Sequence, residues 1–380
     1  MTDDTPPNPA LLPAGLRDLL PPEAETEAAA IGAVLGVFAS HGYQRVKPPL
    51  MEFEDNLLTA TGAAMADQVF RLMDPDTHRM MAIRADMTPQ IARIAATRLA
   101  HAPRPLRLSY NGQCLRVHGS QLDPDRQIAQ AGLELIGPNS PAADAEILAV
   151  GAEALASVGL SRVSVDLTMP TLVSKLLEES GIIGGQRSHL TFALDRKDAA
   201  SVAEHGGALA GTLTDLLLAA GPADRALAAL VAADLTPGAR LAADRLAATV
   251  AAIRAQAPGL KLTVDPVEFR GLQYHTGVCF TLYALGHNEE LGRGGRYLCG
   301  EGEPATGLTI YPDAVLRAAP PQTNLRRIYV PLGENGAAFR AQGHATIAGL
   351  EAVSDTRDEA RRLSCSHVVI GGALTALAAE

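Results

Sequence analysis

Apolar residues recur with two different periods along the chain, and these periods predict its elements. Residues 22–40 carry apolar side chains at every third or fourth position, which predicts a helix that ends before Gly42. A second amphipathic helix is expected at residues 142–158. Thr88 and Pro89 are expected as the N-cap and the first residue of another helix.

Shorter apolar runs between these helices predict strands. We expect residues 43–51 as a strand at a sheet margin, because Pro48 and Pro49 cannot donate hydrogen bonds to a neighbouring strand. The turn-rich residues 74–77 separate two apolar runs, which predicts a hairpin. Further strands are expected at residues 106–114, 129–136, 260–269 and 278–283.

The pattern changes near Thr168, and this change predicts the domain organisation. From about residue 170 to 258, alanine and leucine dominate at helical spacing, which predicts an all-helical insertion. We expect a flexible N-terminus at 1–10, one main domain at 11–320 and a short α/β tail at 321–380. An antiparallel sheet with such an insertion and tail is an α+β fold.

Composition narrows the class of protein without indicating its chemistry. The chain has 380 residues, 47% of them apolar and 19% charged, with a mean hydropathy of +0.08, which excludes a largely disordered chain. The uncharged run 28–41 is too short to cross a bilayer, and the acidic N-terminus is unlike a leader peptide. The net charge of −10 provides no general basic surface for nucleic acid.

The four cysteines contain no C-x-x-C pair, which favours reduced thiols and disfavours a zinc site. We therefore expect a cytoplasmic protein without a membrane segment, a metal or a cofactor.

Polar residues cluster in four segments of otherwise apolar sequence. In the first, Asp86 lies between a strand and a helix start, where its carboxylate either receives a ligand's amino group or caps the helix. In the second, Gln130 and Glu134 share one face of a strand, and Arg116 precedes them. These three side chains form either a pocket for a small zwitterion or a solvated sheet face.

The third and fourth segments lie closer to the C-terminus. Residues 269–277 place Arg270, Tyr274 and His275 in a dense polar string between two apolar strands. Residues 292–297 are glycine-rich, but no helix start follows and the spacing fits neither nucleotide-binding fingerprint. We expect this segment as a tight turn between strands.

Together these segments resemble the histidyl-tRNA synthetase branch of the class II aminoacyl-tRNA synthetases. Residues 270–277 are similar to its histidine-specific motif, and 294–297 to its glycine-rich strand turn. Residues 43–52 are similar to the first class II motif, which builds the dimer interface of that family. The resemblance implies an antiparallel sheet flanked by helices, and a homodimer that buries apolar surface around Phe38, Val46 and Leu50.

The resemblance also implies a histidine pocket. Asp86 and Thr88 would take the α-amino group, Glu134 would accept a hydrogen bond from the imidazole, and Arg270 would face the carboxylate. His275 stands where the family has a tyrosine. The residues that carry over are Asp86, Thr88, Arg116, Gln130, Glu134, Arg270, Tyr274 and His275.

The chain departs from the synthetases where ATP and tRNA bind. His118 stands at the position of the glutamate that recognises adenine, and Ala314 at the position of the third-motif arginine. The loop 119–125 holds two aspartates and no basic residue. The residues after Pro320 are too few for an anticodon-binding domain. The resemblance therefore implies that neither ATP nor tRNA is a substrate.

Residues 83–93 are closer to a family of synthetase paralogs, the regulatory subunits of ATP phosphoribosyltransferase. This resemblance implies a non-catalytic subunit without a cofactor. It would activate a short catalytic subunit in the first step of histidine biosynthesis and contribute to feedback inhibition by L-histidine. Two alternatives remain open: an active histidyl-tRNA synthetase and another synthetase-like amino-acid sensor. Histidine-dependent pyrophosphate exchange distinguishes the first of them.

Overall fold

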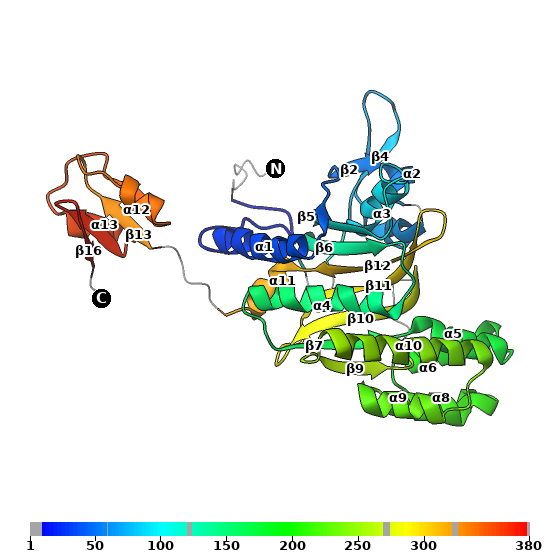
Figure 1. The fold of residues 1–380 in the computed structure, drawn as a ribbon. Coiled ribbons are helices and arrows are strands. Elements are labelled where there is room, and N and C mark those ends of the chain that lie inside the picture. The colour runs from blue at the N-terminus through cyan, green and yellow to red at the C-terminus, as the bar shows by residue number, and fades with distance from the viewer. Residues whose placement is uncertain (1–9, 59, 120–123, 269–273, 321–325, 378–380) are drawn as a thin grey trace, which may run out of the picture. The chain divides into compact units, whose positions relative to one another are not determined.

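A computed structural model describes residues 10–58, 60–119, 124–268, 274–320 and 326–377. The chain divides into two compact units, Met1–Pro320 and Pro321–Glu380 (Figure 1). The expected flexible N-terminus, apart from Ala10, lies outside the described residues. No helix in the described part of the chain is both long and apolar enough to span a membrane.

A nine-stranded sheet forms the centre of the first unit and confirms the expected antiparallel sheet of an α+β fold. Neighbouring strands are antiparallel except for two parallel pairs, β1 with β5 and β7 with β9. Across the sheet the strands are β1 (Gln44–Arg45), β5 (Leu106–Leu115), β6 (Gln127–Ile136), β12 (Glu303–Ile310), β11 (Glu290–Cys299), β10 (His275–Ala284), β7 (Val163–Thr168), β9 (Lys261–Asp265) and β8 (Gly221–Pro222).

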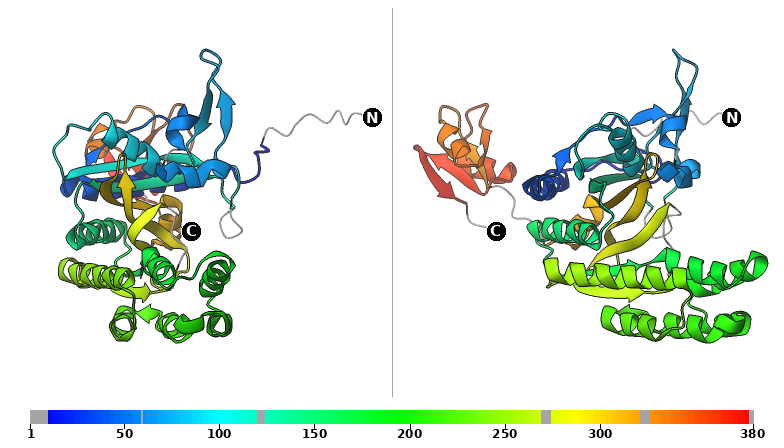
Figure 2. Two further views of the ribbon diagram at one scale, coloured as in Figure 1. Left: turned by 90° about the vertical axis from the view of Figure 1, so that its right-hand side faces the viewer. Right: turned by 45° about the vertical axis from the view of Figure 1, so that its right-hand side comes forward.

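Helices cover the two faces of this sheet differently (Figure 2). Four long helices and α11 (Pro312–Ala318) pack on one face, where they share the main hydrophobic core. The short helices α3 (Thr88–Ala96) and η1 (Ala60–Gln68) lie on the opposite face. The four long helices are α1 (Glu23–Ser40), α4 (Pro141–Ser157), α5 (Pro170–Glu179) and α10 (Pro237–Gln256).

Alternation along β6 directs its side chains to these two faces. Ala131, Leu133 and Leu135 belong to the core on the side of the long helices. Gln130 and Glu134 therefore point to the other face, where α3 packs. The polar residues on this strand thus face α3, on the sparsely covered side of the sheet.

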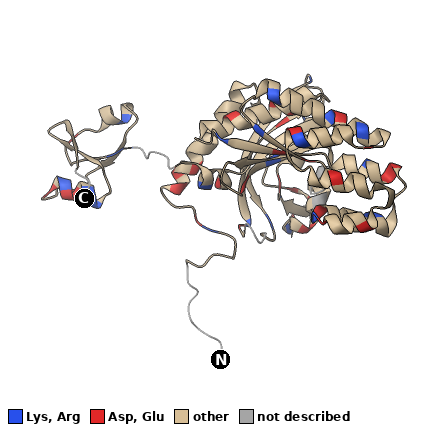
Figure 3. Cartoon of the chain, turned by 90° about the horizontal axis from the view of Figure 1, so that it is seen from below, with Lys and Arg blue, Asp and Glu red and all other residues tan. Residues whose placement is uncertain are grey.

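Residues 170–256 form helices joined by short loops, with the two-residue β8 among them, and their buried leucines recur at helical spacing. Acidic and basic residues are interspersed along the helices in the view of Figure 3. Besides α5 and α10, this part contains α6 (Gly184–Asp195), α7 (Ala199–His205), η2 (Gly207–Leu209), α8 (Ala210–Leu218) and α9 (Ala223–Ala232).

A three-stranded sheet projects from the first unit and contains the expected hairpin. Its strands, in spatial order, are β2 (Met51–Phe53), β4 (Met80–Ile83) and β3 (Arg71–Met73), and α2 (Glu54–Leu57) follows β2. The prediction of one strand at 43–51 is wrong. The segment with Pro48 and Pro49 separates β1 from β2, and the two strands join different sheets.

Two further expectations need correction. Residues 292–297 do not form a tight turn, because they pair with β10 on one side and β12 on the other and lie within β11. Phe38 cannot contribute to a dimer interface, since its side chain is already fully buried in the monomer core.

The second unit has its own sheet in the order β14–β13–β15–β16, parallel except for the last pair. Strands and helices thus alternate in the tail that the sequence predicted as a short α/β segment; α12 and β16 were not predicted. Its elements are β13 (Arg327–Val330), α12 (Ala337–Ala341), β14 (Ala345–Ala348), α13 (Thr356–Arg362), β15 (His367–Ile370) and β16 (Ala373–Ala376).

Candidate functional site

The loop before α3 positions two of the predicted site residues. Thr88 is the first residue of α3 rather than its N-cap, because the cap position falls on Met87. Asp86 instead pairs with an unpaired backbone N–H at the start of the helix, because its Oδ1 accepts a hydrogen bond from the backbone N–H of Thr88 at 3.0 Å. Asp86 therefore caps the helix, and it also lines a pocket.

Glu134 lies at the bottom of this pocket, with only 1% of its surface exposed. Its Oε2 accepts a hydrogen bond from Tyr297 Oη at 2.9 Å, and its Oε1 accepts one from Tyr110 Oη at 3.4 Å. Burial raises the pKa of Glu134 to about 8; the Tyr297 hydrogen bond opposes this shift, and the charge of Asp86 adds to it. A ligand that donates an N–H or carries positive charge suits such a group.

A chain of hydroxyl groups connects Glu134 with the start of α3. Tyr110 Oη lies 2.8 Å from Thr309 Oγ1 and 3.4 Å from Thr88 Oγ1. All three residues are buried. The pocket wall is therefore polar but fixed, because each hydroxyl has a partner that limits its rotation.

Two glycines make room for the groups around Glu134. Gly307 of β12 lies directly opposite Glu134 of β6, and Gly295 of β11 lies opposite Gly307. A Cβ atom at Gly307 would lie 1.7 Å from Glu134 Oε2, and one at Gly295 would lie 2.8 Å from a backbone oxygen of β10. Gly295 also has a φ of +154°, which favours glycine. Only glycine fits at these two positions.

Five of the eight predicted site residues line this inner pocket. Gly295 and Gly307 form part of its floor. The predicted residues in the lining are Asp86, Thr88, Glu134, Tyr274 and His275, and the others that the sequence did not indicate are Arg293, Gly294, Tyr297, Thr309 and Tyr311.

The other three predicted residues have different positions. Gln130 is buried behind the pocket, where its Oε1 accepts a hydrogen bond from the backbone N–H of Met87 at 3.0 Å. Arg116 follows β5 and does not appear among the described lining residues. Its buried Nε has no hydrogen-bond partner in the described part of the chain. Arg270 lies outside the described residues.

Strand parity is the signal that would have found Arg293 and Tyr297. In β11 they share one face with Gly295, because side chains two residues apart point the same way. Interpreting this segment as a turn concealed that alternation. Arg296 points to the opposite face, where its Nη2 lies 2.6 Å from Oδ1 of the fully buried Asp144. Asp144 also pairs with Arg245 of α10 at 3.1 Å.

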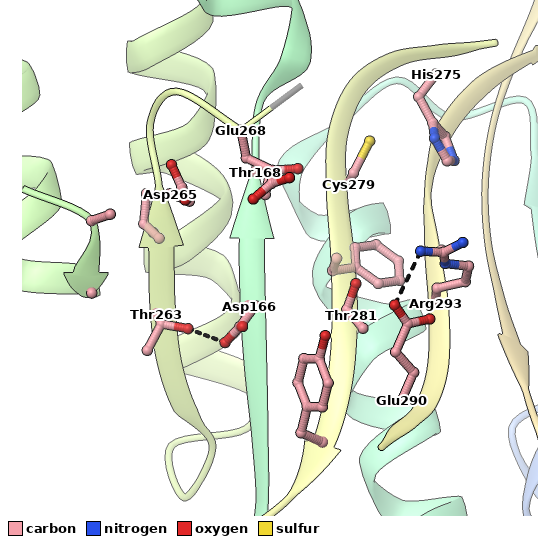
Figure 4. Close-up of a pocket in the computed structure, with 16 residues that line it drawn as sticks. Asp166, Thr168, Thr263, Asp265, Glu268, His275, Cys279, Thr281, Glu290 and Arg293 are labelled. Carbon is pink, nitrogen blue, oxygen red and sulfur yellow. Dashed lines mark hydrogen bonds and ion pairs between the residues drawn. The ribbon is translucent and has the colours of Figure 1, made fainter. Parts of the chain in front are cut away.

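A larger outer pocket of about 380 Å³ adjoins the inner one along β10 and β11 (Figure 4). Asp166, Asp265, Glu268 and Glu290 give its wall an acidic character. Lys197 pairs with two of these carboxylates, Asp265 at 2.5 Å and Glu268 at 3.8 Å. Among the described residues, no three His, Cys, Asp or Glu side chains gather as metal ligands would.

Comparison with known proteins identifies the family of the chain. A model of the histidyl-tRNA synthetase family matches residues 15–315. The chain is 55% identical to the ATP phosphoribosyltransferase regulatory subunit of Paramagnetospirillum magneticum, over 95% of this chain and 96% of that protein. It is 54% identical to the protein of the same name from Gluconobacter oxydans, over 97% of each. The chain belongs to the family of ATP phosphoribosyltransferase regulatory subunits.

Solved structures show that this regulatory-subunit family shares the synthetase fold. An ATP phosphoribosyltransferase regulatory subunit/histidyl-tRNA synthetase from Bacillus halodurans superposes with a TM-score of 0.79 at 24% identity, covering 94% of this chain and 97% of that one. Histidyl-tRNA synthetase from Nostoc sp. gives 0.78 at 19% identity, covering 96% and 91%. At these identities the likeness concerns the fold alone, and it confirms the class II synthetase-like architecture.

At the expected position of the third-motif arginine, this member of the regulatory-subunit family has a buried alanine. Ala314 of α11 is 3% exposed and belongs to the main core. Its neighbour Asp313 accepts a hydrogen bond from the backbone N–H of Ala129 at 3.2 Å and pairs with Arg17. These contacts attach α11 to β6. Of the acidic loop 119–125, residues 120–123 lie outside the described part of the chain.

Proposed function

We propose that this chain is the non-catalytic regulatory subunit of an ATP phosphoribosyltransferase and binds L-histidine in the inner pocket. The observation that carries the proposal is the buried carboxyl group of Glu134, which faces a glycine-lined space beside Asp86. Relatives at 52–55% identity with the regulatory-subunit name support the assignment to this pathway. The short catalytic subunit is the expected partner.

The charges of the pocket complement those of histidine. Asp86 and the Thr88 hydroxyl receive the α-ammonium group, and Glu134 receives a ring N–H of the imidazole. With a pKa of about 8, Glu134 keeps its proton at neutral pH in the empty pocket. An imidazolium ring beside Glu134 favours the ionised carboxylate, because an adjacent positive charge lowers the pKa of a carboxyl group, and the two then form a carboxylate–imidazolium pair. Ligand and pocket then share one proton.

Feedback inhibition requires that histidine bind one state of the assembled complex better than another. Removing the charge of Glu134 or Asp86 leaves a partner group of histidine unpaired, which costs about 2–5 kcal/mol in a desolvated site. We predict that Glu134→Gln and Asp86→Asn each shift inhibition to at least tenfold higher histidine, while uninhibited activity stays near that of the wild type.

The measurement is a histidine titration of phosphoribosyl-ATP formation by the complex of catalytic and regulatory subunits. Glu204→Gln, on an exposed surface of the helical insertion, is the matched control. Unchanged inhibition curves for both pocket variants would mean that histidine acts at another site.

The alternative of an active histidyl-tRNA synthetase predicts aminoacylation. Ala314 and His118 replace the side chains that contact ATP in the family, and each lost charge-assisted contact is worth about 1.5–3 kcal/mol. We therefore expect neither histidine-dependent pyrophosphate exchange nor charging of histidine tRNA by the purified chain. Either activity at an enzymatic rate would favour the synthetase. Binding of a different amino acid in preference to histidine would favour another synthetase-like sensor.

A further inference from the structure

Arg84 is a buried arginine at the start of the loop that joins β4 to α3. Only 6% of its surface is exposed. Its Nε donates a hydrogen bond to the backbone oxygen of Gln113 in β5 at 2.8 Å. Its Nη1 lies 3.3 Å from the backbone oxygens of both Pro48 and Pro49. The guanidinium therefore joins three segments of the chain: the β4–α3 loop, the segment between β1 and β2, and β5.

The surroundings of this guanidinium match its shape. Gly112 of β5 leaves room for it, since a Cβ atom there would lie 2.3 Å from Arg84 Nη2. The side-chain oxygen of Gln90 in α3 lies 3.3 Å from Arg84 Nη1. Gln90 Nε2 in turn donates hydrogen bonds to the backbone oxygen of Pro49 at 2.8 Å and to Glu52 Oε1 at 2.9 Å. Arginine suits this place because its planar group donates in several fixed directions, whereas a lysine ammonium is a single point on a flexible stem.

Backbone hydrogen bonds hold the chain on both sides of Asp86. Before it, the backbone N–H of Arg84 donates to the backbone oxygen of Leu50 at 3.1 Å, and the Arg84 oxygen accepts one from the end of β5 at 3.0 Å. After it, the backbone N–H of Met87 donates to Gln130 Oε1 at 3.0 Å. The direction of the Asp86 carboxylate therefore depends on two fixed points, and the Arg84 side chain supports the first of them.

We propose that Arg84 is a positioning residue, which holds the β4–α3 loop so that Asp86 meets the α-ammonium group of the ligand. The inference rests on the proposed function, because it names the support of one contact in that same pocket. Without the guanidinium, the loop loses its side-chain bonds to Pro48, Pro49 and β5. A shift of about 1 Å at Asp86 then suffices to weaken a charge-assisted hydrogen bond severely.

Two ligands that differ in the α-amino group test this assignment. L-histidine carries the ammonium, whereas imidazolepropionate has the same ring and carboxylate without it. We expect Arg84→Met to weaken L-histidine binding about tenfold and imidazolepropionate binding by less than about threefold. Ligand-observed NMR titration of the full chain is the measurement, because it also covers weak binding. Both ligands are compared on the same variant, so a partial loss of folded protein affects the two alike.

Arg240 of α10 provides a matched control for the loss of a structural arginine. Its guanidinium also donates to backbone oxygens, those of Leu230 and Ala233, each at 2.7 Å. Arg240→Met should therefore lower stability and leave both affinities unchanged. If Arg84→Met does not fold, Arg84→Lys gives the same comparison, because it keeps the charge and loses the planar set of donors. We expect a smaller loss with the same preference between the two ligands.

Double variants separate positioning from general support of the pocket. If Arg84 acts through Asp86, the variant Asp86→Asn already removes what Arg84→Met can remove. The double variant should then bind L-histidine about as weakly as Asp86→Asn alone. In combination with Glu134→Gln, which changes the imidazole contact, the two losses should multiply. Multiplied losses in both combinations, or equal loss of both ligands in Arg84→Met, would overturn the inference.

The design separates this inference from the proposed function. L-histidine binding that depends on Asp86 but not on Arg84 would leave the proposed pocket intact and show that the positioning role is wrong. If L-histidine binds neither the wild-type chain nor its complex with the catalytic subunit, the proposed function fails and this inference fails with it.

Discussion

Glu134 is a buried acidic residue whose protonation affects the stability of the fold. In the described part of the chain its partners are hydroxyl groups rather than a cation. Its pKa rises from 4.5 to about 8 because it is buried. Between these values the folded chain binds more protons than the unfolded chain, so the free energy of unfolding falls as pH rises. The empty pocket is therefore a source of instability near neutral pH.

The variant Glu134→Gln removes this titration and should change the pH dependence of stability. We predict that its free energy of unfolding, relative to that of the wild type, rises between pH 5 and pH 8 by up to about 1.4 kcal/mol per pH unit. Denaturant unfolding of both full chains across this range is the measurement. Glu204→Gln serves as the exposed control, and parallel pH profiles for wild type and Glu134→Gln would contradict the assigned pKa.

At this scale the sequence could predict the sheet face on which a residue lies, but not the contacts that its side chain makes. Parity along one strand correctly placed Gln130 and Glu134 on the same sheet face. Parity could not show that Gln130 bonds to the backbone of Met87, because that contact joins segments 43 residues apart. Arg293 was missed for a different reason, since the glycines beside it resemble a turn until their pairing partners are known.

At the scale of elements, β11 carries different chemistry on its two faces. Tyr297 faces the pocket and bonds to Glu134, whereas the adjacent Arg296 faces the long helices and pairs with Asp144. Arg245 extends this ion-pair cluster to α10. The helical insertion and the pocket strand are therefore joined through one buried carboxylate.

Breaking this cluster should destabilise the fold strongly. Asp144→Asn leaves the Arg296 guanidinium buried without its countercharge, and we predict a loss of about 3–5 kcal/mol in the free energy of unfolding. The double variant Asp144→Leu with Arg296→Met removes both charges and should lose less than the single variant. Denaturant unfolding measures both. A single-variant loss below that of the double variant would indicate that the pair is not the main support.

Element prediction succeeded where local patterns are strong. The leucine spacing predicted the helices of residues 170–256, and the turn residues at 74–77 predicted the β3–β4 hairpin. It failed for the segment that contains β1 and β2, because sheet membership depends on distant partners. It also failed for β16, whose pairing with β15 is antiparallel and not encoded in its own four residues.

At the scale of the whole molecule, the resemblance to class II synthetases predicts a homodimer. Phe38 is internal, but Leu50 is 48% exposed in the segment between β1 and β2, which resembles the first class II motif. We predict that the full chain sediments as a dimer and that Leu50→Asp shifts it toward monomer. Sedimentation equilibrium over a range of concentrations is the measurement.

A matched control tests whether the position matters. Leu241 of α10 is 71% exposed and lies outside that motif, so Leu241→Asp should leave the dimer intact. A wild-type chain that remains monomeric at every concentration would contradict the predicted dimer. Equal effects of both substitutions would indicate a different interface.

The paired glycines near Glu134 relate ligand binding to the stability of the fold. Gly307 and Gly295 leave out two side chains where neighbouring strands would otherwise present them. The inner pocket lies in this part of the side-chain layer, and in the proposed function one group of the bound amino acid enters it. A ligand that binds only the folded chain stabilises it by mass action, so in the proposed function L-histidine raises the melting temperature of the subunit.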